Sequence, residues 1–223
     1  HQALANERRA LAEAAAANDA VQMIEELFDA SMLDLGSNDF AQTVPLRTSV
    51  DVAAREMVER SMLRLQSSML DQPAARARLL TSIGTLALNV GMVREARSMI
   101  TEAIALYQDC GLQDSLVAAS AHLALARIET EQRNRDTAHH LFELTKGILV
   151  AHGAAQSNLW ADVVIFQSWV AISSKSRELA AEYLPELQQA VDLKSKLLGN
   201  KDSQTVLAKA FLAMNRALVS RDY

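Results

Sequence analysis

The chain has 223 residues, half of them hydrophobic, and a formal net charge of −5. This is enough apolar material for a core, and an acidic chain without a long basic stripe is a poor match for nucleic-acid phosphates. No apolar run reaches the roughly 18 residues of a membrane-spanning helix. The single cysteine, Cys110, excludes an internal disulfide.

The composition predicts helix along the whole chain. Ala and Leu dominate, with Glu, Gln and Arg between them, and there are only 7 Gly and 3 Pro. These common residues lose little side-chain freedom in a helix. Strand-length runs of β-branched residues do not occur, so the predicted fold class is all-α.

The N-terminal part is expected to be separate from the rest. Residues 1–35 form a predicted Ala-rich stalk and a first packed helix, with helix over 3–33. Residues 36–48 contain Gly36, Asn38, Asp39 and Pro45 and form a predicted linker. Because the chain begins with His1, we expect it to be part of a longer protein.

Residues 49–223 are predicted to form a series of helices. Ser49 is a plausible N-cap for the first of them. Apolar periodicity and turn residues place the helices at 50–70, 74–90, 93–109, 113–131, 135–151, 156–172, 176–198 and 203–219.

A repeat of 42 residues runs through these helices. Small residues recur at this interval on the second helix of each predicted pair, at Ala96, Ala138 and Ala180. The same interval relates small residues on the first helices, at Gly84, Ala126 and Ser168, and places Ala210 on a last helix without a partner. It also relates large apolar residues, at Ile100, Phe142 and Leu184. The pattern predicts helix pairs that cross closely at small residues and stack.

This spacing, in residues 80–103 above all, resembles a tetratricopeptide repeat of the 42-residue type. The stretch 198–205, with the following Leu207-Ala208 and Leu212-Ala213, is similar to a junction in such arrays, although Asp202-Ser203 replaces the usual His-Pro. The resemblance implies an antiparallel helix-hairpin solenoid, a right-handed superhelix, over residues 49–223.

A second resemblance concerns residues 23–28 and 49–91, which include Asp71-Gln72-Pro73. They are similar to the region after the membrane span of bacterial serine/threonine protein kinases with C-terminal tetratricopeptide arrays. This implies a regulatory region in signalling, located outside the cytoplasmic membrane. The alternative is the effector-sensing array of a bacterial transcription regulator, which leaves the compartment open and includes a cytoplasmic location.

The resemblance also implies a binding surface, because the first helix of each hairpin lines a concave groove in this fold. The partner-binding residues carried over are Arg78, Thr85, Asn89, Arg127, Glu131, Asp162, Ile165, Trp169 and Phe211. Trp and Arg are frequent binding anchors, so the expected partner is a protein or peptide, with a homodimer also possible. The alternative is that Trp169 and Phe211 are covered by the chain's own next helix or by a second copy.

Catalytic and metal-binding patterns are weak. The chain has no Gly-rich phosphate loop, His-Arg-Asp or Asp-Phe-Gly motif. His139 and Glu143 could share a helix face, but a zinc site needs three or four converging ligands. We therefore expect no catalytic residues, no metal and no cofactor in this chain.

Overall fold

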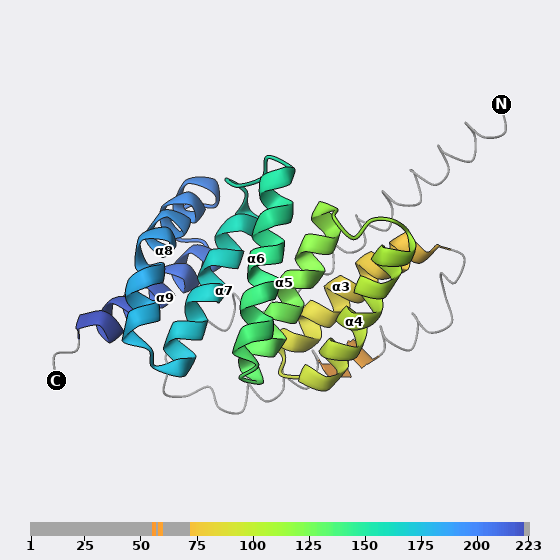
Figure 1. The fold of residues 1–223 in the computed structure, drawn as a ribbon, viewed down its shortest axis with the longest axis horizontal. Helices are drawn as coiled ribbons and strands as arrows, with labels where there is room; N and C mark the ends of the chain where they lie inside the picture. The colour runs from red at the N-terminus through yellow and green to blue at the C-terminus, as the bar shows by residue number, and fades with distance from the viewer. Residues whose placement is uncertain (1–54, 57, 60–71, 221–223) are drawn as a thin grey trace. The chain divides into compact units, whose positions relative to one another are not determined.

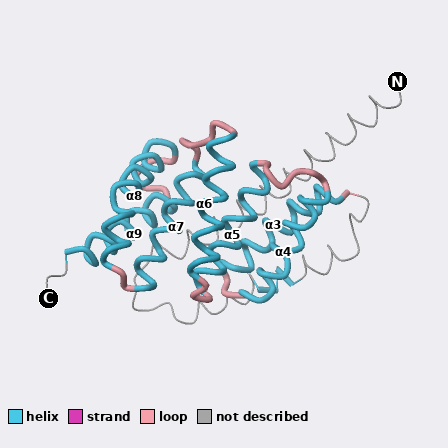
Figure 2. The backbone as a smooth tube through the Cα atoms, viewed as in Figure 1, coloured by secondary structure: helices cyan, strands magenta, loops and turns pink. Residues whose placement is uncertain are grey.

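The structure of the protein is a computed structural model that describes residues 55, 56, 58, 59 and 72–220. Within these residues the secondary structure is helical, and Figure 2 shows helices joined by short loops. The helices are α3 (Pro73–Asn89), α4 (Val93–Asp109), α5 (Leu116–Glu131), α6 (Arg135–Ala151), α7 (Asn158–Ser174), α8 (Arg177–Leu197) and α9 (Ser203–Ser220). The prediction of an all-α chain is confirmed for this part of the sequence.

The chain divides into two compact units, residues 1–113 and 114–223. The sequence predicted a single array over 49–223, whereas the structure has a boundary after Gln113. The predicted stalk and first packed helix at 1–35 and the linker at 36–48 lie outside the described residues. In the first unit we describe α3 and α4, and in the second α5 to α9.

In the first unit, α3 and α4 pack against each other around Gly84. Pro73 occupies the first turn of α3, where its missing N–H leaves no hydrogen bond unmade. Gly84 is buried, and a β-carbon there would lie 2.9 Å from Cδ1 of Ile100 on α4. A close crossing of the two helices at this glycine is therefore confirmed.

The turns inside the hairpins repeat at the predicted interval. Gly91, Arg133 and Lys175 have φ angles of 77°, 64° and 54°, so each adopts the left-handed conformation. In each turn, the next residue donates its N–H to a carbonyl five positions back, and the N···O distances are 2.8, 2.9 and 3.0 Å. This is the Schellman pattern of helix termination. The 42-residue repeat is thus present in the backbone as well as in the sequence.

In the second unit, the helices form hairpins that pack in chain order, as the labels in Figure 1 show. α5 packs mainly on α6, and α7 packs mainly on α8. α9 then contacts both α8 and α7. Ser115, Ser157 and Ser176 precede α5, α7 and α8, and each accepts a hydrogen bond from a backbone N–H in the first turn. These caps satisfy donors that the helix cannot pair internally.

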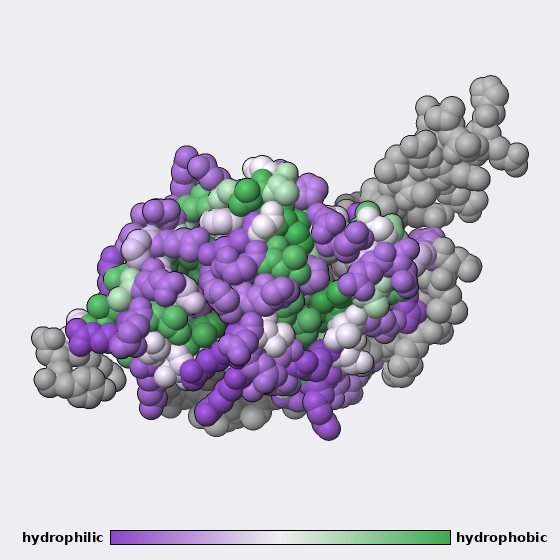
Figure 3. Space-filling view, viewed as in Figure 1, coloured by the Kyte–Doolittle hydropathy of each residue, from purple (hydrophilic) through white to green (hydrophobic). Residues whose placement is uncertain are grey.

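Two apolar clusters form the core of the second unit. One joins α5, α6 and α7 around Phe142, and the other joins α7, α8 and α9 around Leu187. The small residues Ala126, Ala138, Ser168 and Ala180 are all fully buried, as the repeat predicted. Ala210, the corresponding residue of α9, is exposed. Polar residues dominate the surface seen in Figure 3, with hydrophobic patches between them.

Candidate functional site

The nine predicted binding residues are divided between the two units. Arg78, Thr85 and Asn89 lie on α3 in the first unit. Thr85 is partly buried, and its hydroxyl donates to the carbonyl of Thr81 at 2.8 Å. Asn89 is exposed at the end of the helix, and Arg78 is half-buried. The remaining six residues lie on α5, α7 and α9 in the second unit, where the contacts between them can be described.

Ile165 and Phe211 were expected to face a binding groove, and this prediction is wrong. Their exposed fractions are only 2% and 8%, and both belong to the cluster between α7, α8 and α9. Phe211 packs against Trp169, with a ring-centroid distance of 5.5 Å. Phe211 is thus buried by the preceding helices α7 and α8, not by a following helix or a second copy as the alternative interpretation supposed, and Trp169 stays partly exposed.

Phe166 is a residue of this surface that was not among the predicted binding residues. The guanidinium carbon of Arg127 on α5 lies 4.1 Å from the centre of the Phe166 ring on α7. A cation over an aromatic face is attracted by the ring quadrupole. Phe166 follows Asp162 by four residues and precedes Trp169 by three, so all three share one helix face. That spacing was the signal in the sequence that would have identified it.

We call Arg127, Glu131, Asp162, Phe166 and Trp169 the Arg127 cluster. It lies on α5 and α7, which are the first helices of two successive hairpins. Glu131 is exposed, and the other four side chains are partly buried. The cluster combines a stacked guanidinium, two aromatic rings and two carboxylates that water can still reach.

The charges of the cluster alternate and are partly removed from water. Burial lowers the pKa of Arg127, although Glu131 and Asp162 act in the opposite direction. Burial also raises the pKa of Glu131, against the effect of Arg127. Desolvated charges interact more strongly with a ligand than fully hydrated ones.

Asp162 is also held by a buried lysine. Lys194 on α8 is 1% exposed, and its ammonium nitrogen lies 2.9 Å from Oδ1 of Asp162. It also donates to Oδ1 of Asn158 at 2.7 Å and to Oε1 of Gln204 at 2.8 Å. All three donors of the ammonium group therefore have oxygen partners. This network connects α7, α8 and the first turn of α9, and it fixes one end of the Arg127 cluster.

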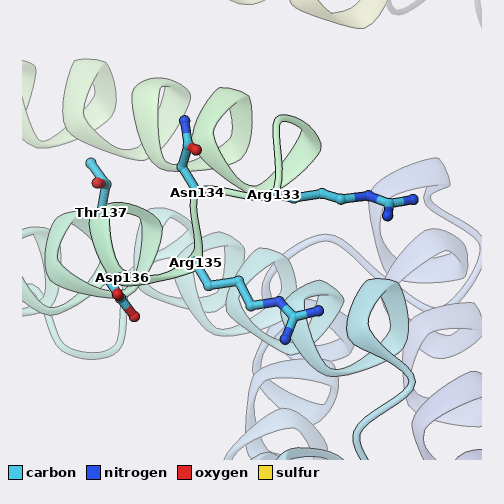
Figure 4. Close-up of a pocket in the computed structure, with 5 residues that line it drawn as sticks. All are labelled: Arg133, Asn134, Arg135, Asp136 and Thr137. Atoms are coloured by element: carbon cyan, nitrogen blue, oxygen red, sulfur yellow. The ribbon is translucent and has the colours of Figure 1, made fainter.

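A separate polar depression lies at the turn between α5 and α6, lined by Arg133, Asn134, Arg135, Asp136 and Thr137. Figure 4 shows that the side chains of Arg133 and Arg135 extend toward the same side. Asp136 places a carboxylate in the same depression. Since that charge opposes an anion, we assign no ligand to this depression.

The remaining candidates within the described ranges are a metal site on α6 and a membrane-spanning helix. His139 and Glu143 are both exposed on α6. No group of three or more His, Cys, Asp or Glu residues in the described part could hold a metal ion. Among the described helices, none combines the length and hydrophobicity needed to cross a bilayer.

The chain matches no protein-family model, no curated protein and no solved structure. The contacts of the described residues therefore provide the basis for a functional proposal.

Proposed function

We propose that this chain is a protein-interaction module, a tetratricopeptide-like solenoid that binds a peptide segment of a partner through the Arg127 cluster. The observation that carries the proposal is the stacking of Arg127 on Phe166 at 4.1 Å, beside the partly exposed Trp169. Arg and Trp are over-represented among residues that dominate binding energy. The rings of Phe166 and Phe211 already hold the side chains of Arg127 and Trp169 in place, so little entropy is lost on binding.

The chemistry of the cluster indicates the kind of peptide. The rings of Phe166 and Trp169 offer an apolar contact, and the carboxylates of Glu131 and Asp162 offer hydrogen-bond acceptors close enough to Arg127 to affect its pKa. A peptide with an apolar anchor next to a donor-bearing side chain would satisfy both. We expect roughly micromolar affinity, about −8 kcal/mol.

The test is selection of peptides from a displayed random library against the full chain. Selected peptides should bind the wild type and lose at least about tenfold in affinity to Glu131→Arg, which reverses an exposed charge. Glu182→Arg is the matched control, because Glu182 is an exposed acidic residue on α8, away from the cluster. Failure to select any peptide, or equal binding to both variants, would contradict the proposal.

The biological setting follows from the sequence resemblance alone. We place the module in the regulatory region of a bacterial serine/threonine kinase. The check is the gene that encodes the chain. Kinase motifs in the same polypeptide would support this setting, and a winged-helix domain would assign the module to a transcription regulator instead.

A further inference from the structure

α9 has a second apolar face, on the side opposite its core contacts. Thr205, Ala208, Leu212 and Asn215 are buried among its core-facing residues. Val206, Leu207 and Met214 are 53%, 49% and 40% exposed, and Ala210 and Ala213 are exposed as well. At 3.6 residues per turn these five residues cover a stripe of about 120°, which is the width of a face that packs on another helix. We call this stripe the outer face of α9.

The repeat shows what occupies such a face. Each residue of the outer face has an equivalent 42 positions earlier on α7 and 84 positions earlier on α5. On α5 all of these equivalents are buried, and on α7 all are buried except Ile172, which is half-buried. On α7 the covering residues come from the second helix of the same hairpin, at Leu187, Ala190 and Val191, and from α9. An amphipathic helix is therefore the element that fits this face.

The sequence of the second helices specifies that element further. In α4, α6 and α8 a small residue is followed four positions later by a large apolar one, as in Ala96 and Ile100. Ile100 is the side chain that lies closest to Gly84, the equivalent of Ala210 on α3. A helix with this small-to-large spacing would place its large apolar residue against Ala210, as Ile100 is placed against Gly84.

The positive charge along α9 favours an acidic helix of a partner protein over a second copy of this chain. α9 contains no acidic residue, and its cations Lys209 and Arg216 lie along one edge of the outer face. Lys209 donates to the side-chain oxygen of Asn200 at 2.8 Å, and Arg216 donates to Gln188. Among the described residues neither cation is paired with a carboxylate. Two copies packed through α9 would bring these basic edges together, whereas an acidic helix would neutralise them.

We propose that the outer face of α9 is a docking surface for an acidic amphipathic helix of a partner protein. Its large apolar residue packs on Ala210, its small residue lies four positions earlier on the same helix face, and its acidic edge lies along Lys209 and Arg216. This surface is distinct from the Arg127 cluster and does not depend on the function proposed for it.

The probe is a synthetic peptide of residues 93–109, the sequence of α4, offered to the full 223-residue chain. It carries Ala96 and Ile100 at the required spacing, and Glu95 and Glu102 lie along one edge of its apolar face. A matched control peptide carries Glu95→Lys and Glu102→Lys. Fluorescence anisotropy should show binding of the first peptide, and binding of the control should be at least about tenfold weaker.

Two variants of the chain locate the binding. Ala210→Glu, at an exposed position, should abolish binding with an unchanged circular dichroism spectrum. The double variant Lys209→Glu, Arg216→Glu should reverse the preference between the two peptides. Binding that ignores Ala210→Glu would mean that the peptide replaces α4 in its own hairpin, and it would overturn the proposal. Dimerisation of the wild type that Ala210→Glu abolishes would assign the face to a second copy and would also overturn it.

Discussion

A β-carbon on Gly84 would lie 2.9 Å from Cδ1 and 3.0 Å from Cγ1 of Ile100. The crossing of α3 and α4 is therefore closer than any residue with a side chain allows without movement. The equivalent crossings tolerate a β-carbon, because Ala126 and Ser168 stand at the same repeat position and are fully buried. In Ser168 the hydroxyl donates to the carbonyl of Ile165 at 2.7 Å, so its polar group is satisfied in the core.

Gly84→Ala should destabilise the chain. Forcing a methyl group against Ile100 costs about 1–3 kcal/mol, and the better helix propensity of Ala returns about 1 kcal/mol. We expect the free energy of unfolding to fall by about 1 kcal/mol. Urea denaturation followed by circular dichroism measures the change.

Two further variants test the steric cause. Gly147→Ala lies on an exposed side of α6 with no atom within 4 Å of the added carbon, so it should stabilise the chain by about 1 kcal/mol. Ile100→Val removes Cδ1 and should restore part of the stability lost in Gly84→Ala. A double-mutant cycle with no coupling between positions 84 and 100 would show that the contact is not the cause.

Arg133→Gly and Lys175→Gly should each stabilise the chain. Both residues have positive φ angles in the hairpin turns, at the position that Gly91 occupies in the first repeat. The left-handed conformation costs a residue with a β-carbon about 1–2 kcal/mol, and glycine avoids that cost but gains freedom in the unfolded chain. We expect a net gain of about 0.5–1 kcal/mol for each substitution, measured by thermal or urea unfolding.

The control for the turns is Gln132→Gly. Gln132 precedes Arg133 and has a φ of −82°. Because a φ of −82° strains no residue, glycine relieves no strain at this position. The free energy of unfolding of this variant should therefore fall by about 0.5–1 kcal/mol. If Arg133→Gly and Gln132→Gly changed the free energy of unfolding equally, the strain could not be assigned to the left-handed position of Arg133.

Lys194→Met should be strongly destabilising. It keeps the apolar stem but leaves Asp162 without its cation and leaves two amide oxygens, of Asn158 and Gln204, without their donor. Removing one member of a buried ion pair costs about 3–5 kcal/mol, and the partial exposure of Asp162 reduces this to about 2–3 kcal/mol. Lys196→Met, exposed on the same helix, should change the free energy of unfolding by less than about 0.5 kcal/mol.

Helix positions could be predicted well from the sequence. The bounds of α4 and α6 agree with the predicted ranges 93–109 and 135–151. Apolar periodicity and turn glycines are local signals of helix position. The 42-residue repeat allowed each helix to be placed a second time, from its equivalents elsewhere in the chain. The burial of Lys194 could also have been predicted from the sequence, because Lys194 follows Leu187, Ala190 and Val191 at helical spacing on the buried stripe of α8. Without the positions of α7 and α9, nothing indicated that three oxygen atoms would meet its ammonium group.

The candidate site was harder to predict, because it depends on the rotation of α7 about its axis. Choosing Ile165 instead of Phe166 is an error of one residue, which is about 100° on a helix. The sequence of α7 is apolar on nearly all sides, with Val163, Val164, Ile165 and Phe166 in succession. Such a helix has no polar face to fix its orientation. Its rotation is instead set by α8 and α9, which pack around Ile165.

The balance between burial and charge at Asp162 predicts a pH dependence. Burial raises the pKa of Asp162 above its ordinary value of 3.8, and the charges of Lys194 and Arg127 only partly oppose this. The native state then binds the proton more tightly than the unfolded chain, so the free energy of unfolding falls as the pH rises from the ordinary pKa to the raised one. Relative to Asp162→Asn, the wild type should therefore lose stability above pH 3.8 and reach a constant difference above the raised pKa. Urea titrations of both proteins between about pH 3.5 and 7 measure this difference. If the wild type gained stability with pH relative to the variant, the ion pair with Lys194 would outweigh the cost of burying the carboxylate.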